Sequence, residues 1–374
     1  METGTARAGS DLAAAAGSTE VQGPEPRLVV ADADSGVVDV IDLATEETVH
    51  SFDVENASSL TTINGRYVVA TDGERARLLD PGSWTIEHGD HSHSYVKDPV
   101  EIGALDGVEP AHVIAGDRKV SVFFDGSGTA DIVDFDSLSA GEPTPSTTIE
   151  SDPQHGIVVP LSDHYVVSTG GTEEELPTGL ELRDETGDVV RALDGTCAQM
   201  HGEAVFSNYV VVACEDGVLK VDGINGEFTT TKSPYPLPDV RAWSLTRGSR
   251  GALVAAPTNA GVMVLDTESG VWVQARTADE ALSAGISGDG KTLFSVQQDG
   301  TFRTFDAVTG AELSSTPLME APVEAVDIQV AGSRAYVSDP AGNRVLEIDY
   351  RDSGRVARTF DFDYSPASIG VVGA

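Results

Sequence analysis

The sequence predicts an all-β protein, an eight-bladed β-propeller of four-stranded antiparallel blades whose ring is closed by the C-terminal strand. Three observations predict it. A β-branched strand recurs eight times along the 374 residues, turn-forming residues follow each copy, and one unpaired strand remains at the C-terminal end. Repeats of about 40 residues with four short strands are typical of propellers, in which neighbouring blades cover each other's apolar faces.

The recurring strand is short and rich in valine, as in RLVVAD, RYVVATD and NYVVVACEDG. Its copies begin 39 to 53 residues apart, at Arg27, Arg66, Lys119, His164, Asn208, Gly251, Lys291 and Arg334. A turn and a further strand follow, as in GVMVLDTESG and GTFRTFDAVTG. The aspartate and glycine that end this further strand indicate a hairpin into a fourth.

The propeller is expected to span residues 27–374. The first repeat lacks an innermost strand, and the segment SPASIGVVGA at 365–374 can supply it by pairing with residues 27–54. A pair of β-sandwiches is the alternative fold, but it does not explain the regular spacing or the spare strand. Seven blades is the alternative count, because the second repeat is longer and carries an inserted loop.

Residues 1–26 are rich in Ala, Gly, Ser and Thr, and we expect a flexible linker there. A signal peptide has a basic start and an apolar core, and neither is visible. A removed leader or a lipid anchor is compatible with this stretch, so we expect an extracytoplasmic protein. Cys197 and Cys214 favour a disulfide in such a compartment, and two buried thiols are the alternative.

The net charge of −38 excludes nucleic acids and anionic lipid surfaces as partners. General solubility explains such a charge, and gathering of cations is the second reading. No run of eighteen apolar residues occurs, so the sequence predicts no transmembrane segment. We expect a monomer.

One group of histidines lies in the segment EHGDHSHSY. It comprises His88, Asp90, His91 and His93. Three imidazoles and a carboxylate within six residues suit a borderline metal such as zinc. A solvated polar loop that binds no metal is the alternative.

A second group is spread over three repeats. His112, His155 and His201 each stand where the innermost strand of the third, fourth or fifth blade begins. Equivalent positions in adjacent blades line one rim of the central channel, so we expect the three imidazoles to meet and bind zinc. Asp125 and Glu203 are the candidates for a fourth ligand. Three unrelated core histidines are the alternative.

The remaining residues of this kind are assigned structural roles. His50 and His164 lie within predicted strands. Trp243 takes the place of the histidine in the sixth repeat, and we expect it to pack in the core.

The segments HGDHSHSY, QHGIVVPL and CAQMHGEA, the last followed by CEDGVL, resemble the exported zinc metallochaperones, propeller proteins that work with a zinc ABC transporter. The resemblance covers the second to fifth repeats. It implies that the chain binds Zn²⁺ and delivers it to the transporter's solute-binding protein. The ligands it implies are among His112, His155 and His201, with a second, mobile site at residues 88–93.

Two other functions compete with this one. A zinc ion with an open position could activate water in a hydrolase, with Glu203 as base. The sequence has no paired catalytic carboxylates at a recurring position, no nucleophile elbow and no phosphate loop, so we expect no enzyme. A metal-free interaction scaffold is the other alternative, and zinc affinity separates it from a zinc carrier.

Overall fold

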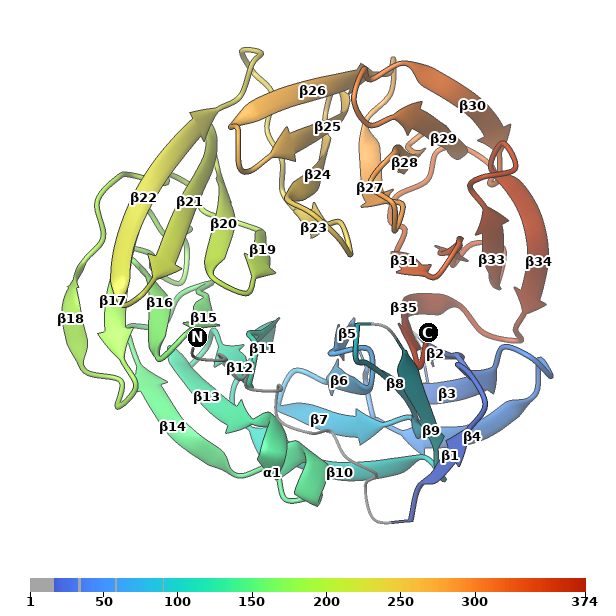
Figure 1. Cartoon of the computed structure of the whole chain (residues 1–374), viewed down its shortest axis with the longest axis horizontal. Coiled ribbons are helices and arrows are strands. Elements are labelled where there is room, and N and C mark those ends of the chain that lie inside the picture. The colour runs from blue at the N-terminus through green and yellow to red at the C-terminus, as the bar shows by residue number, and fades with distance from the viewer. Residues whose placement is uncertain (1–16, 33–34, 58, 90) are drawn as a thin grey trace, which may run out of the picture.

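The computed structural model describes residues 17–32, 35–57, 59–89 and 91–374. Within these residues the strands form eight four-stranded sheets and one three-stranded sheet, beside a single short helix, α1 (Phe135–Ala140). The four-stranded sheets stand around a common centre, each with one strand innermost and one on the rim (Figure 1). The predicted all-β class is confirmed.

The four-stranded sheets share one antiparallel order from centre to rim. In chain order they are β35 (Pro366–Val372), β2 (Arg27–Asp32), β3 (Val37–Asp42) and β4 (Thr48–Asp53); β5 (Ser59–Ile63), β6 (Tyr67–Thr71), β7 (Arg75–Asp80) and β10 (Val100–Asp106); β11 (Pro110–Ala115), β12 (Lys119–Phe124), β13 (Thr129–Asp134) and β14 (Pro145–Glu150); β15 (Val158–Leu161), β16 (His164–Thr169), β17 (Gly179–Asp184) and β18 (Val189–Ala192); β19 (Glu203–Phe206), β20 (Tyr209–Cys214), β21 (Gly217–Ile224) and β22 (Glu227–Pro234); β23 (Thr246–Arg247), β24 (Leu253–Thr258), β25 (Gly261–Asp266) and β26 (Val271–Arg276); β27 (Ala281–Ile286), β28 (Thr292–Gln297), β29 (Thr301–Asp306) and β30 (Glu312–Pro317); and β31 (Ile328–Ala331), β32 (Arg334–Asp339), β33 (Arg344–Asp349) and β34 (Arg355–Asp361).

The eight recurring strands of the sequence are the second strands of these sheets, from β2 to β32. They are almost wholly buried, whereas outer strands such as β18 are exposed along their length. A strand that is covered on both faces can be apolar at every position, which explains the continuous valine runs.

The apolar core is divided among the gaps between neighbouring sheets. Eight clusters of buried side chains occur in the described residues, and each is built mainly from two adjacent sheets. The last of them joins the eighth sheet to the first through residues such as Val345, Phe360 and Leu28. The hydrophobic effect therefore acts around the whole ring, because each four-stranded sheet packs against its two neighbours.

The C-terminal strand closes the ring, as the sequence predicts. Strand β35 pairs with β2 in antiparallel register from Arg27↔Val372 to Asp32↔Pro366. The partly buried carboxylate of Asp327, just before β31, accepts hydrogen bonds from the backbone N–H of Ile369 (3.0 Å) and the hydroxyl of Ser368 (3.1 Å). These bonds join the eighth sheet to the strand that completes the first.

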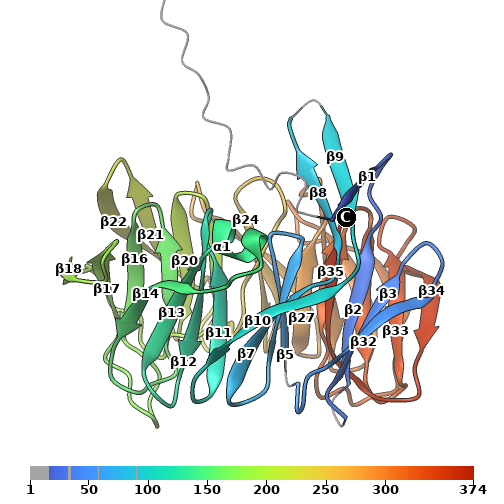
Figure 2. The ribbon, with the colours of Figure 1, turned by 90° about the horizontal axis from the view of Figure 1, so that it is seen from below.

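The inserted loop of the second repeat is a β-hairpin, which corrects the expectation of a loop. Strands β8 (Ser83–Glu87) and β9 (Ser92–Val96) pair with each other, and β1 (Thr19–Val21) pairs with β9. Of the predicted linker, residues 1–16 lie outside the described residues, whereas residues 19–21 form this strand. Figure 2 shows the hairpin rising above one face of the ring. No described helix is long and apolar enough to cross a membrane.

Candidate metal centre

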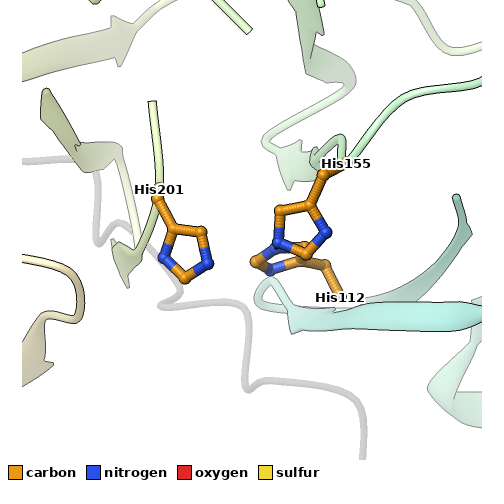
Figure 3. Close-up of side chains that lie close together, drawn as sticks. All are labelled: His112, His155 and His201. Carbon is orange, nitrogen blue, oxygen red and sulfur yellow. The ribbon is translucent and has the colours of Figure 1, made fainter. Parts of the chain in front are cut away.

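Three imidazoles from three neighbouring sheets meet beside the centre of the ring. His112 lies in β11, His155 precedes β15 and His201 precedes β19, and their rings face one another (Figure 3). The Nε2 atoms of His112 and His155 are 3.0 Å apart, and one ligand atom of each histidine lies within 4.8 Å of the others. The predicted meeting of these histidines is confirmed. They are far apart in the sequence but take equivalent positions in three successive sheets, which places them side by side.

Each of the three rings has an oxygen atom on the side of its Nδ1 atom, and for His155 and His201 that oxygen accepts a hydrogen bond. A carboxylate oxygen of Asp125 lies 2.5 Å from Nδ1 of His155, and one of Glu203 lies 3.5 Å from Nδ1 of His112. The backbone carbonyl of Trp243 lies 2.7 Å from Nδ1 of His201. A hydrogen bond accepted from Nδ1 places the proton there, so the lone pair of a neutral His155 or His201 ring is on Nε2. The Glu203 oxygen nearest to His112 accepts no hydrogen bond in the described residues, so this carboxylate acts on His112 through its charge.

Burial and charge act in opposite directions on this cluster. Burial disfavours the charged form of His112, but the carboxylates of Glu203 and Asp125 outweigh it and raise the His112 pKa. Burial lowers the pKa of His201, and repulsion from the other two imidazoles adds to this. Burial alone would raise the pKa of Glu203, yet the neighbouring imidazoles, His112 first, hold it below its usual value. The cluster thus keeps a buried carboxylate charged beside its imidazoles.

The donor set fits a borderline divalent cation. Three imidazole nitrogens at one point are a common zinc base, and carboxylates behind the imidazoles supply compensating negative charge. One oxygen of Asp125 is buried with no hydrogen-bond partner in the described part of the chain. The group whose ligand atoms converge consists of the three histidines and does not include Asp125 or Glu203. Both carboxylates are close to the cluster, but on the Nδ1 side of the rings.

A disulfide holds the segment that carries His201. Cys197 and Cys214 are bonded, as the sequence favours, and both are fully buried. His201 donates its backbone N–H to the carbonyl of Ala213, the residue before Cys214, at 3.1 Å. The crosslink therefore ties the connection before β19 to strand β20 at the point where the His201 side chain leaves the backbone.

Trp243 is not a core residue, and this prediction from the sequence is wrong. Its side chain is 49% exposed, with Arg241 stacked on the ring at 3.3 Å from its centre. The indole meets the imidazole of His201 edge to face, with centres 5.6 Å apart. The sequence could not reveal that the Trp243 carbonyl accepts a hydrogen bond from His201, because every residue has a backbone carbonyl.

The other predicted histidine group lies on the β8–β9 hairpin. The rings of His88, His91 and His93 have their centres 5.0 to 5.3 Å apart, and Asp90 lies outside the described residues. Nδ1 of His93 is 2.6 Å from a carboxylate oxygen of Glu20 on β1. The sequence did not single out Glu20, because a three-residue strand inside a Gly- and Ala-rich segment has no clear pattern.

The two histidine groups belong to opposite faces of the ring. The hairpin joins the third and fourth strands of its sheet, as α1 does in the next sheet, and both lie toward the upper face in Figure 2. In an antiparallel four-stranded sheet, the connection between the third and fourth strands lies at the end of the sheet where the innermost strand ends. The innermost strand therefore begins at the opposite face. His112 lies in the first half of β11, and Asp125 in the turn from β12 to β13, at the other end.

The two remaining histidines pack against phenylalanines. The His50 ring lies 4.5 Å from that of Phe52, and the His164 ring lies 4.9 Å from that of Phe228. The structural roles assigned to both histidines agree with these contacts.

Comparison with known proteins gives a clear likeness. The sequence is 24% identical over 348 residues to the zinc chaperone AztD of Citrobacter koseri, covering 86% of this chain and 81% of AztD. The resemblance to zinc metallochaperones is confirmed. That relative is named a chaperone and not an enzyme, in agreement with our expectation for this chain. No protein-family model matches the sequence.

Solved structures support the same fold. The crystal structure of Citrobacter koseri AztD superposes with a TM-score of 0.84 at 22% identity, over 94% of this chain and 98% of that one. The apo form of that protein gives 0.84 at 21%, over 94% and 99%. BamB from Moraxella catarrhalis, at 14% identity, gives 0.55 over 86% and 95%.

Proposed function

We propose that this chain is a zinc chaperone that holds Zn²⁺ between the Nε2 atoms of His112, His155 and His201. The observation that carries the proposal is the convergence of one ligand atom from each of the three rings, with acceptors at Nδ1 of His155 and His201 and the Glu203 carboxylate near Nδ1 of His112. The similarity to a protein named a zinc chaperone supports zinc as the cargo.

Asp125 and Glu203 act on the ion through the rings. A carboxylate at Nδ1 fixes the tautomer and makes the opposite nitrogen a stronger donor. Zinc prefers four ligands, so three imidazoles leave one position for water or for an incoming group of a partner. This open position allows ligand exchange without prior release of the ion.

We further propose that the partner is the zinc-binding solute-binding protein of an ABC transporter, in an extracytoplasmic compartment that permits the Cys197–Cys214 disulfide. The eight four-stranded sheets are eight blades of one propeller, residues 27–374, that works as a monomer. Residues 1–26 are a linker, in which β1 is a docked segment. The hairpin holds a second zinc site built on His88, His91 and His93, and Asp90 is a candidate ligand from the sequence alone.

Equilibrium zinc binding tests the proposal. Wild-type protein, His155→Ala and the matched control His164→Ala are titrated with Zn²⁺ against a chromophoric chelator. We expect His155→Ala to lose the tight site and His164→Ala to keep it. Micromolar or weaker affinity that His155→Ala leaves unaltered refutes the proposal and favours a metal-free scaffold.

Delivery is tested separately. Zinc-loaded protein is mixed with the apo solute-binding protein, and transfer is timed against release of zinc to a chelator. Transfer should be the faster process, and equal rates would mean passive dissociation.

A further inference from the structure

We propose that strand β1 completes a metal site on the hairpin face, in which Glu20 orients His93 toward an ion shared with His88 and His91. The choice of Zn²⁺ as that ion rests on the proposed function. The assignment of Glu20 and of the N-terminal strand rests on the geometry of the hairpin.

The hairpin presents its imidazoles together at its tip. His88 donates its backbone N–H to the carbonyl of His91 at 2.8 Å, which closes the turn. The rings of His88 and His93, and those of His91 and His93, meet edge to face. His88 and His91 are both exposed, so an ion in solution can reach their side chains.

Glu20 gives His93 the same support that the ring-centre histidines receive. Its carboxylate oxygen lies 2.6 Å from Nδ1 of His93 and accepts a hydrogen bond from that nitrogen. The lone pair is then on Nε2, as in the pair Asp125–His155. The same hydrogen-bonded arrangement of carboxylate and imidazole thus occurs at both clusters of histidines.

The register of β1 places Glu20 where it can do this. Glu20 is opposite Tyr95 in the antiparallel pair, and His93 is two positions along β9 on the same face of the sheet. The hairpin itself is fixed at its base, where Trp84 stacks on Tyr95 and Arg66 lies over the Trp84 ring at 3.7 Å from its centre. The part of the site that can dock or leave is therefore β1.

A consequence is that metal binding and docking of β1 stabilise each other. An ion that binds more tightly when Glu20 is in place must favour the paired state of β1 by the same factor. Because the hairpin and the ring-centre histidines belong to opposite faces, occupation of one site should leave the affinity of the other unchanged.

The test uses the full chain with His155→Ala and His201→Ala, so that the hairpin is the remaining histidine cluster. Zn²⁺ alone is titrated into this background, and into the same background with Glu20→Gln, Glu20→Asp or the control Glu47→Gln. Glu47 is an exposed carboxylate in the turn before β4, so its variant matches the change of charge. Loss of a carboxylate behind a ligating histidine costs roughly 10- to 100-fold in affinity, and we expect this for Glu20→Gln, with partial rescue by Glu20→Asp.

Hydrogen exchange provides the second readout. Zinc should slow exchange of the amides in residues 19–21 and 94–96 in the background protein, and should do so less in Glu20→Gln. An exposed Glu–His pair contributes little to stability by itself, so a purely structural role of Glu20 would not produce a zinc-dependent change.

Three results would overturn the proposal: no zinc binding in the background protein, equal affinities for Glu20→Gln and Glu47→Gln, or exchange that zinc does not alter. The proposed function fails on a different measurement. The variant with His88, His91 and His93 all changed to Ala keeps the ring-centre histidines. If this variant does not bind zinc tightly, the proposed function is refuted, whereas the assignment of Glu20 does not depend on this result.

Discussion

The substitution Glu203→Gln separates two effects of one carboxylate on the ring-centre site. Glu203 is buried beside the histidines, and its charge raises the pKa of His112 in the metal-free protein. A higher pKa makes a proton a stronger competitor for the imidazole. The same charge attracts the dication more strongly than it attracts a proton, so its removal should weaken zinc binding and also make the remaining binding less sensitive to acid.

The size of the loss follows from the distance and the burial. Two unit charges about 4 Å apart interact by about 4 kcal/mol at the effective dielectric of a partly buried site. Burial of the carboxylate offsets part of this, because desolvation is the largest single influence on the Glu203 pKa. We therefore expect a loss of about 1.4 to 2.7 kcal/mol, a 10- to 100-fold weaker affinity, as for other carboxylates behind a ligating histidine.

The assay is a competition titration with Zn²⁺ over a series of pH values, on wild type, Glu203→Gln and Glu173→Gln. Glu173 is an exposed carboxylate, so its variant controls for net charge. Wild-type affinity should begin to fall at a pH above the ordinary imidazole pKa of about 6.5, and the fall should begin at lower pH in Glu203→Gln. An unchanged affinity at high pH, or a fall that begins at higher pH in the variant, would refute the reasoning.

Three further predictions concern the site and the ring. Changing Cys197 and Cys214 together to Ala should lower the free energy of unfolding by about 3 kcal/mol and weaken zinc binding; denaturant unfolding and titration measure both, and an unaltered zinc affinity would refute the link to His201. Burial raises the pKa of Asp327, so its contribution to stability should decrease as pH rises above the ordinary carboxyl value of about 3.9; the difference in melting temperature between wild type and Asp327→Asn should shrink over that range, and a growing difference would contradict it. Trp243→Ala should keep the backbone acceptor of His201 and so reduce zinc affinity less than His155→Ala does, which the same titration checks.

The propeller repeats could be predicted from the sequence because burial on both faces leaves a visible pattern. The eight apolar strands, their turns and the spare C-terminal strand all follow from composition along the chain. The β8–β9 hairpin and β1 could not be predicted in the same way. They stand outside the ring, so fewer of their positions are buried and the alternation that marks a strand is weak.

The ring-centre site was also predicted only in part: the sequence pattern indicated its histidines, but not the contacts that those histidines make. His112, His155 and His201 could be predicted to converge because they take equivalent positions in consecutive repeats, and repeat symmetry places such positions side by side. The roles of Asp125 and Glu203 could not be settled, because a carboxylate near a histidine can face either ring nitrogen. The backbone carbonyl at Trp243 and the partnership of Glu20 with His93 depend on packing between distant segments.

The separation of the two histidine groups limits how a zinc carrier of this shape can work. If both sites bind zinc, an ion on the hairpin has no short path to the ring-centre histidines of the same molecule. Each site must then exchange its ion with a partner or with solvent from its own face. The open coordination position of a three-histidine site suits transfer to a protein ligand that approaches next to Trp243, whose indole lies half exposed against His201. Replacing the three hairpin histidines should consequently leave the rate of transfer from the ring-centre site unchanged, and a slower transfer would show that the hairpin takes part in delivery.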